Sequence, residues 1–127
     1  MDVPPGEPVS VLTRIAACTG PSEVLEIAGK LSVKLKAEGA LAIIRGLRSC
    51  LHDVRRVSLG LQPLAHVPGS LDGLAATAPA AEAAAEHFSR AEESLSRNGR
   101  VLVVLTSALL GFWREVHPEH SGRDVAS

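Results

Sequence analysis

Residues 100–116 read RVLVVLTSALLGFWREV and form the most apolar stretch of the chain. If this stretch is a helix, its apolar side chains point in every direction, which is typical of a helix buried on all sides or inside a membrane. A buried strand is the alternative for residues 101–106. We favour a helix because the apolar run is too long for one strand and reaches Pro118 without a turn signal. The stretch therefore predicts a C-terminal core or interface helix that contains Val101, Leu105, Leu109, Phe112 and Trp113.

The same stretch is too short to cross a bilayer. A helix over residues 100–116 would be about 25 Å long at ~1.5 Å per residue, whereas a membrane span needs roughly 20 consecutive apolar residues. Thr106, Ser107 and Gly111 also interrupt the apolar run. We therefore expect this helix to be buried in the core of the protein or in an interface.

Length and composition predict a single all-α domain. The chain has 127 residues, of which 46% are hydrophobic and 2% aromatic, and it contains no Tyr. Strands favour aromatic and β-branched residues, so an aliphatic and alanine-rich core favours closely packed helices instead. We expect a compact bundle of roughly four to five helices. The bundle should cover residues 9–118, between a flexible arm over residues 1–8 and a flexible tail over residues 119–127.

Apolar periodicity and helix breakers define the other expected helices. They cover residues 9–18, 21–38, 40–58 and 79–97, and Gly39 separates the second from the third. Gly46 lies in the middle of the third helix, where the missing side chain allows a neighbouring helix to come close. Asn98 and Gly99 then predict a break, with one of the two in the left-handed conformation.

The fourth expected helix has an apolar seam made mostly of alanine, so a partner helix can pack closely against it. The seam consists of Ala81, Ala84, Phe88, Ala91 and Leu95. Before this helix, residues 59–73 predict an irregular connection with one helical turn near residues 71–76. A loose connection of this length is uncommon in a compact domain, so we expect Leu61, Leu64 and Val67 to tie it onto the body.

The third expected helix carries a basic stripe, which is the most informative surface feature. Residues 30–56 contain seven Lys and Arg against two acidic residues, while residues 72–93 contain five acidic residues against one Arg. One interpretation is a binding face for an acidic partner, an anionic ligand or an anionic membrane surface. The other is that the two helices are neighbours whose charges offset each other, or that the charges are merely solvated. The candidate partner-binding residues are Arg45, Arg48, His52, Arg55 and Arg56.

The remaining chemistry favours no enzyme, cofactor or metal. The net charge is −1 and no aromatic residues are interleaved with the basic ones, so we expect no nucleic-acid partner. No nucleotide-binding or hydrolase motif occurs. His117-x-x-His120 with Glu119 is the one metal-like spacing, but it follows a helix-ending proline and is not supported by other ligands. Cys18 and Cys50 lie in apolar stretches, which predicts buried free thiols and an intracellular, cytoplasmic location; a disulfide between them is the alternative.

Asn98-Gly99-Arg100, placed directly before an apolar helix, resembles the Asn-Trp-Gly-Arg stretch that opens the buried central helix of the Bcl-2 family. The Trp of that motif is absent here, and only a short tail follows the apolar helix. The resemblance covers about twenty residues. It implies a helical regulator that binds an amphipathic helix in a groove, with Arg100 near that groove.

The sequence is most consistent with a non-catalytic protein–protein interaction module, such as an adaptor, a regulator or an assembly subunit. The second and third helices carry more apolar residues than one small core needs, so we expect a protein partner or a homo-oligomer. The additional residues are Leu25, Ile27, Val33, Leu41 and Ile43. The alternatives are a Bcl-2-like regulator, or a module that binds an anionic ligand or a membrane surface through the basic stripe.

Overall fold

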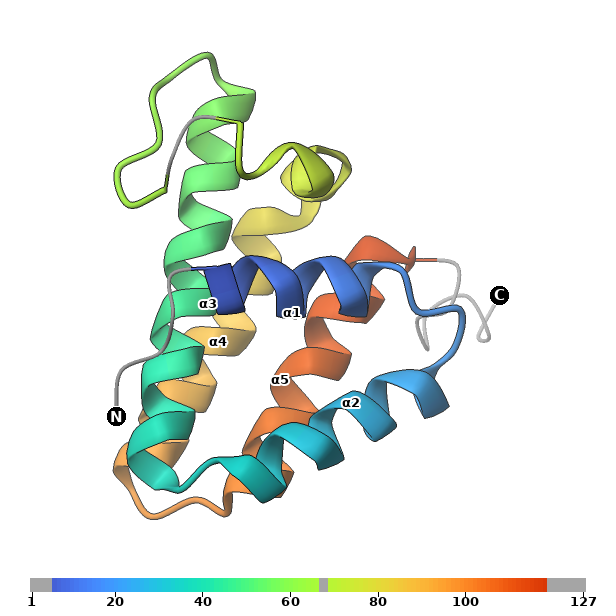
Figure 1. Cartoon of the computed structure of the whole chain (residues 1–127), viewed down its shortest axis with the longest axis vertical. Coiled ribbons are helices and arrows are strands. Elements are labelled where there is room, and N and C mark those ends of the chain that lie inside the picture. Colours follow the sequence, from blue (N-terminus) through green and yellow to red (C-terminus); the bar gives the residue numbers. More distant parts are fainter. Residues whose placement is uncertain (1–5, 67–68, 119–127) are drawn as a thin grey trace.

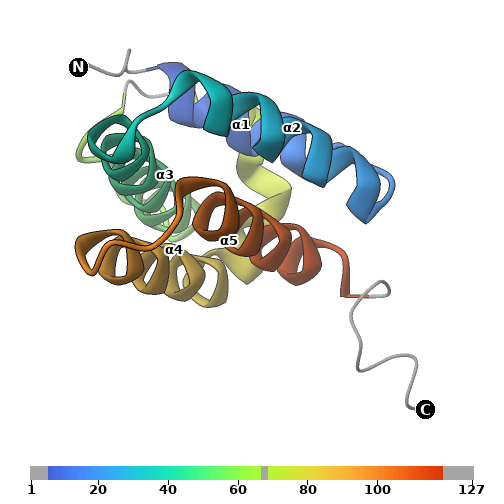
Figure 2. The same ribbon diagram turned by 90° about the horizontal axis from the view of Figure 1, so that it is seen from below.

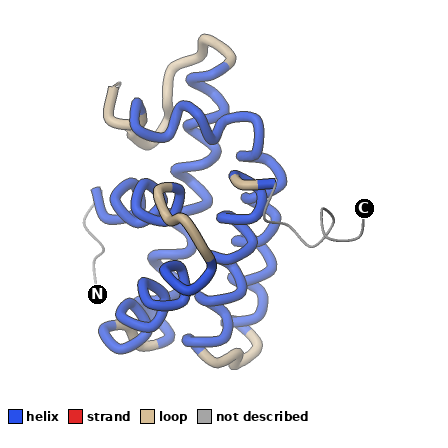
Figure 3. Tube along the Cα trace, turned by 90° about the vertical axis from the view of Figure 1, so that its right-hand side faces the viewer, coloured by secondary structure: helices blue, strands red, loops and turns tan. Residues whose placement is uncertain are grey.

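The computed structural model describes residues 6–66 and 69–118, and these residues form an all-α fold without strands (Figures 1 and 3). The elements are α1 (Gly6–Ala16), α2 (Pro21–Lys34), α3 (Ala37–Ser58), the 3₁₀ helix η1 (Asp72–Ala80), α4 (Ala81–Ser96) and α5 (Val101–Val116). The predicted all-α bundle is therefore confirmed. Residues 1–5, Val67 and the predicted tail over residues 119–127 lie outside the described residues.

α5 lies at the centre of the arrangement and contacts each of the other elements. α3 and α4 run side by side, α5 follows α4, and α2 packs against the other side of α5 (Figures 1 and 2). α1 crosses over α3 and α5 and closes the core from one face. The apolar stretch that suggested the fold is thus the element around which the chain packs.

The burial of α5 is nevertheless one-sided, contrary to the expectation that it would be buried on all sides. Leu105, Leu109 and Phe112 are fully buried, but Leu102 and Val103 are more than half exposed. The helix is covered by α4 on one flank and by α2 and α1 on the other, which leaves a narrow outer strip open to solvent. The apolar sequence of α5 therefore predicted more burial than the neighbouring helices provide.

Small residues determine how closely the helices approach. The predicted alanine seam is confirmed, because Ala81, Ala84 and Ala91 are buried where α4 meets its neighbours. Gly46 also allows a close approach as predicted, since a Cβ atom at this position would lie 2.6 Å from Cγ of Pro8 on α1. At the centre of the core, the rings of Phe88 and Phe112 lie 6.2 Å apart.

Several boundaries differ from those expected. α1 begins at Gly6, so residues 6–8 of the predicted arm are helical. The break between α2 and α3 lies at Leu35, whose backbone is extended, and Gly39 is buried inside the first turn of α3 rather than ending α2. The helical turn predicted near residues 71–76 continues as 3₁₀ helix up to Ala80. The predicted left-handed break is confirmed at Asn98, which has φ of 68°.

Two hydrogen bonds tie the last helix to the first. The Trp113 indole Nε1 donates to the carbonyl of Cys18 at 2.9 Å in a buried setting, and His117 Nε2 donates to the carbonyl of Ala16 at 2.8 Å. The two rings also pack against each other, with their centroids 5.2 Å apart. Cys18 and Cys50 are both buried and free, so the prediction of free thiols is confirmed over the disulfide alternative.

Candidate interaction surface

The predicted basic stripe lies on α3 and faces the acidic side of α4. Arg45 Nε is 3.2 Å from Oε1 of Glu92, and Arg48 Nη1 is 2.9 Å from Oε2 of the same carboxylate. Arg55 forms an ion pair with Glu82 in the first turn of α4. The two oppositely charged segments are therefore neighbours whose charges partly offset each other.

A groove of about 520 Å³ lies between these two helices. Leu51, Ala81 and Ala85 give it an apolar floor, and arginines, His52 and Glu82 form its walls. The side chains of Arg45, Arg48 and Arg55 are each 42–58% exposed, and exposed ion pairs contribute only about 0–1 kcal/mol to stability. Glu82 is 79% exposed, so an acidic partner can replace it on Arg55 at little cost, and the groove remains a candidate binding site.

Arg56, the fifth predicted residue, is separate from this groove and serves the following loop. Its Nε donates to the carbonyl of Gln62 at 2.8 Å. The structure thus divides the predicted set, with four residues on the groove and one at the base of the connection between α3 and η1.

The main anchor of that connection is Asp53, a role that the sequence alone did not predict. This carboxylate is fully buried. Its Oδ1 accepts a hydrogen bond from the backbone N–H of Leu64 at 2.9 Å, and its Oδ2 accepts bonds from the N–H of Ala65 and from Nδ1 of His66, both at 2.8 Å. The sequence did contain an indication of this role: Asp53 interrupts the apolar face of α3 between Cys50 and Val54. A charged side chain on a buried face requires hydrogen-bonding partners.

These bonds determine the ionisation of Asp53. Burial raises the pKa of the carboxyl, but the hydrogen bonds from His66, Leu64 and Ala65 and the charge of His66 lower it by more, so the pKa lies below its ordinary value of 3.8. The side chain is therefore a carboxylate at neutral pH. We name Asp53 with its bonds to Leu64, Ala65 and His66 the loop latch.

The loop held by this latch, together with the last turn of α3, exposes apolar side chains. We name these four residues the apolar tip: Val57, Leu59, Leu61 and Leu64, which are 42–69% exposed. The expectation that Leu61 and Leu64 tie the loop onto the body is wrong, because polar bonds from its backbone do so instead. In Figure 1 the loop projects beyond the end of α3, and none of the four tip residues lines the groove between α3 and α4.

Other candidate sites have less support. Among the described residues, no three His, Cys, Asp or Glu side chains are placed to share a metal ion. Glu119 and His120 of the metal-like spacing lie outside the described residues, and His117 is bonded to Ala16.

Arg100, the residue highlighted by the Bcl-2 resemblance, lines neither the α3–α4 groove nor a smaller cleft of about 260 Å³ between α4 and α5. Within residues 6–66 and 69–118, every helix is too short or too polar to span a bilayer.

Comparisons with known proteins returned no family model, no curated protein and no solved structure that matches this chain.

Proposed function

We propose that this chain is a non-catalytic protein–protein interaction module that binds its partner through the apolar tip and the groove between α3 and α4. The observation that carries the proposal is the exposure of four aliphatic side chains around a loop with a fixed backbone. Contiguous exposed apolar residues mark interaction sites in proteins of this size. Here four such residues lie within the eight positions from Val57 to Leu64.

The loop latch supports the proposal because it orders the tip before any partner arrives. A buried carboxylate is costly unless it is well hydrogen-bonded, and the three hydrogen bonds that Asp53 accepts all come from residues of the loop. A binding segment that is already ordered loses less conformational entropy on association. This arrangement is therefore better explained by a binding surface than by a connection whose only role is to join two helices.

The surface also defines the chemistry of the partner. The tip needs apolar residues opposite Leu59, Leu61 and Leu64, while the exposed arginines of the groove favour carboxylates. A segment that combines apolar and acidic side chains meets both requirements. Such a segment can belong to another protein or to a second copy of this chain, whose own α4 is acidic.

A site-specific photo-crosslinker at position 61 tests the proposal, with position 25 as its control. Leu61 on the tip is 49% exposed and Leu25 on α2 is 47% exposed. The two positions therefore differ in their location on the surface and not in their solvent exposure. We expect a discrete protein adduct at position 61 in an extract of the native cells. The captured protein, once purified, should bind Leu61→Asp at least about tenfold more weakly than the unmodified chain, as expected for a central apolar contact.

The matched variant Leu25→Asp should leave that affinity unchanged. Equal weakening by Leu61→Asp and Leu25→Asp, or the absence of a specific adduct at position 61, would overturn the proposal. Analytical ultracentrifugation of the purified chain distinguishes a second copy from a different partner, because only self-association makes the mass depend on concentration.

A further inference from the structure

A second surface lies at the opposite end of the molecule from the apolar tip. α2 ends at Lys34 and α3 begins at Ala37, while α4 ends at Ser96 and α5 begins at Val101. Figure 1 shows these two connections together at the lower end of the bundle, with the loop that carries the tip at the upper end. We name this lower surface the cationic end and define it by Lys36, Arg100, Val33, Leu102 and Val103.

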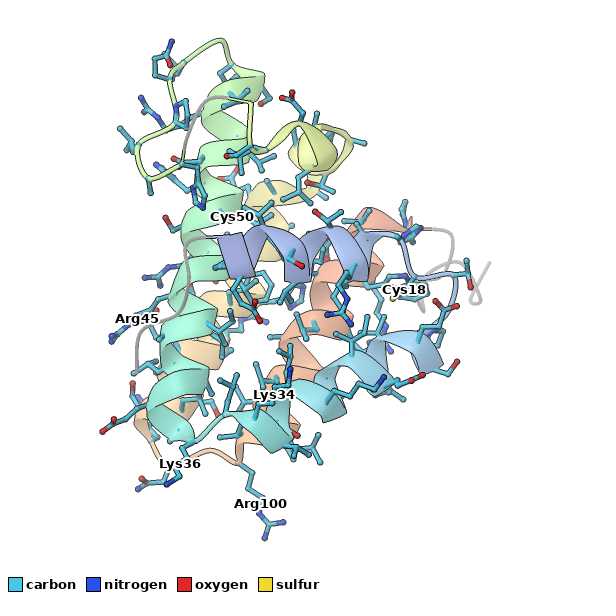
Figure 4. All side chains as sticks on the ribbon, in the orientation of Figure 1. Cys18, Lys34, Lys36, Arg45, Cys50 and Arg100 are labelled. Atoms are coloured by element: carbon cyan, nitrogen blue, oxygen red, sulfur yellow. The ribbon has the colours of Figure 1, made fainter. Side chains whose placement is uncertain are left out.

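The cations of this end lack the ion pairs that neutralise the basic stripe of α3. Among the described residues, no salt bridge involves Lys36 or Arg100, and both are exposed. In Figure 4 Lys36 and Arg100 lie at the lower end, and the Arg100 side chain extends away from the fold. The acidic groups near the same connections are Glu38 and Glu93, and Glu93 is already paired with Arg97 at 2.8 Å. The end therefore carries an excess of positive charge on a chain whose net charge is −1.

Exposed aliphatic side chains accompany these cations. Val33 is 88% exposed, the highest value among the large hydrophobic residues described, and Leu102 and Val103 are more than half exposed. Val33 belongs to the last turn of α2, and the other two belong to the first turn of α5, which packs against α2. The combination of Lys and Arg with exposed aliphatic residues is the one by which peripheral proteins bind an anionic lipid surface.

We infer that the cationic end docks onto an anionic lipid surface. Its cations and aliphatic residues lie at or beside the two connections at this end of the molecule, and of the five only Val103 lines one of the two clefts. A flat array of anionic headgroups can meet Lys36 and Arg100 together, and exposed aliphatic residues of the same end can enter the interface between headgroups and acyl chains. Docking in this way would hold the apolar tip away from the membrane, where a protein partner can reach it. Lipid docking does not depend on the proposed function of the tip.

Vesicle flotation with the full chain tests this inference. We expect binding to phosphatidylcholine vesicles that contain about 30% phosphatidylserine, little binding to phosphatidylcholine alone, and weaker binding as salt rises. Lys36→Gln/Arg100→Gln should reduce the partition coefficient at least about tenfold. The control Arg14→Gln/Arg114→Gln removes the same charge from exposed positions at the ends of α1 and α5, and should change binding less than about twofold.

Two further variants distinguish a lipid surface from a soluble polyanion and from docking through the apolar tip. Leu102→Ser/Val103→Ser should also weaken vesicle binding but leave the binding of soluble polyglutamate unchanged, because only a lipid interface takes up aliphatic side chains. Leu61→Asp on the apolar tip should leave vesicle binding unchanged. The inference is overturned if the unmodified chain does not bind anionic vesicles, or if Arg14→Gln/Arg114→Gln loses as much binding as Lys36→Gln/Arg100→Gln. It is also overturned if Leu102→Ser/Val103→Ser binds vesicles normally, or if Leu61→Asp abolishes vesicle binding. All substituted positions are exposed, and circular dichroism should show that each variant retains its helices.

Discussion

Asp53 Oδ2 lies 2.8 Å from Nδ1 of His66, and this buried pair joins the helix α3 to the loop that carries the apolar tip. Because a carboxylate only accepts hydrogen bonds, Nδ1 of His66 is the donor. The His66 side chain is 10% exposed and that of Asp53 is 1% exposed, so water competes little for either group. The carboxylate of Asp53 is therefore the main anchor of the loop, beside the bond from Arg56 to the carbonyl of Gln62.

Replacing Asp53 with Asn should destabilise the fold and loosen the loop. An amide offers one acceptor oxygen instead of two and directs an N–H₂ group toward donors, so at least one buried backbone N–H loses its partner. We expect the free energy of unfolding in urea to fall by about 2 kcal/mol. Hydrogen exchange at Leu64 and Ala65 should accelerate. A change smaller than about 0.5 kcal/mol, with unaltered exchange, would mean that the latch does not hold the loop.

The contribution of Asp53 to stability should depend on pH in a defined direction. Its pKa is lower in the folded protein than the ordinary value of 3.8, so its stabilising effect is complete above that value and is lost as pH falls through the folded-state pKa. The difference in unfolding free energy between the unmodified chain and Asp53→Asn should therefore be constant near pH 5 and shrink below about pH 4. Urea titrations of both proteins at several acidic pH values measure it, and a difference that grows on acidification contradicts the assignment.

Gly111→Ala should destabilise the protein even though alanine favours helices. A Cβ atom at position 111 would lie 2.5 Å from Cγ and 2.6 Å from Nδ1 of His87, so the imidazole would have to move. We expect a loss of about 1–3 kcal/mol in thermal or urea unfolding. Gly29→Ala is the matched control, because Gly29 is also helical and a Cβ there meets nothing within 4 Å. That change should stabilise the protein by up to about 1 kcal/mol.

The double variant Gly111→Ala/His87→Ala shows whether the imidazole is the cause. Removal of the ring leaves room for the new methyl group, so the alanine at position 111 should cost little or nothing when His87 is already replaced. If the penalty of Gly111→Ala is the same with and without the imidazole, the strain lies elsewhere in α5.

Both cysteines should be unreactive in the folded protein. Burial, assisted by the negative charge of Asp53, raises the pKa of the Cys50 thiol to about 12, and burial is also the main cause that raises the pKa of Cys18. The thiolate is the reactive form, and at neutral pH it is a very small fraction of either thiol. Alkylation followed by mass spectrometry should show no modification of Cys50 under native conditions and complete modification in concentrated urea. Rapid native labelling of Cys50 would show that the packing of α3 opens frequently.

A charge in the centre of α5 should prevent folding, whereas the same charge on its outer strip should not. Leu109 is fully buried and Leu102 is half exposed. Leu109→Asp places an unpaired carboxylate in the core, at a cost of several kcal/mol, so circular dichroism should show loss of cooperative unfolding. Leu102→Asp should retain the fold, with a change within about 1 kcal/mol. A folded Leu109→Asp protein would contradict the central role of α5.

Apolar periodicity was sufficient to predict the helices, because each buries a face that recurs every three or four residues. The alanine seam of α4 is buried as expected. Ends were harder to predict: Gly39 has the residue type of a helix stop, yet tertiary packing places it inside the first turn of α3. Of the five apolar residues assigned to a self-associating surface, Ile43 is in the core, Ile27 and Leu41 are partly buried, and Leu25 and Val33 are exposed.

The candidate site was only partly predictable because it depends on contacts between distant segments. The spacing of Arg45, Arg48 and Arg55 was enough to place them on one stripe of α3, and the acidic α4 was recognised as one of their candidate neighbours. Nothing in the local pattern pairs Asp53 with His66, since the loop between them has no periodicity. Leucines in that loop suggested anchoring side chains, whereas the backbone is anchored and the leucines are exposed.

The bonds from Trp113 to Cys18 and from His117 to Ala16 have a consequence for the order in which the chain is made. The partners are separated by 95 and 101 residues, respectively. During translation α1 leaves the ribosome first, and α5 leaves after all the helices that it covers. Until then α1 and α2 lack the apolar surface on which they pack. The nascent chain therefore completes its core only when α5 emerges, and the early helices are exposed to chaperones until then.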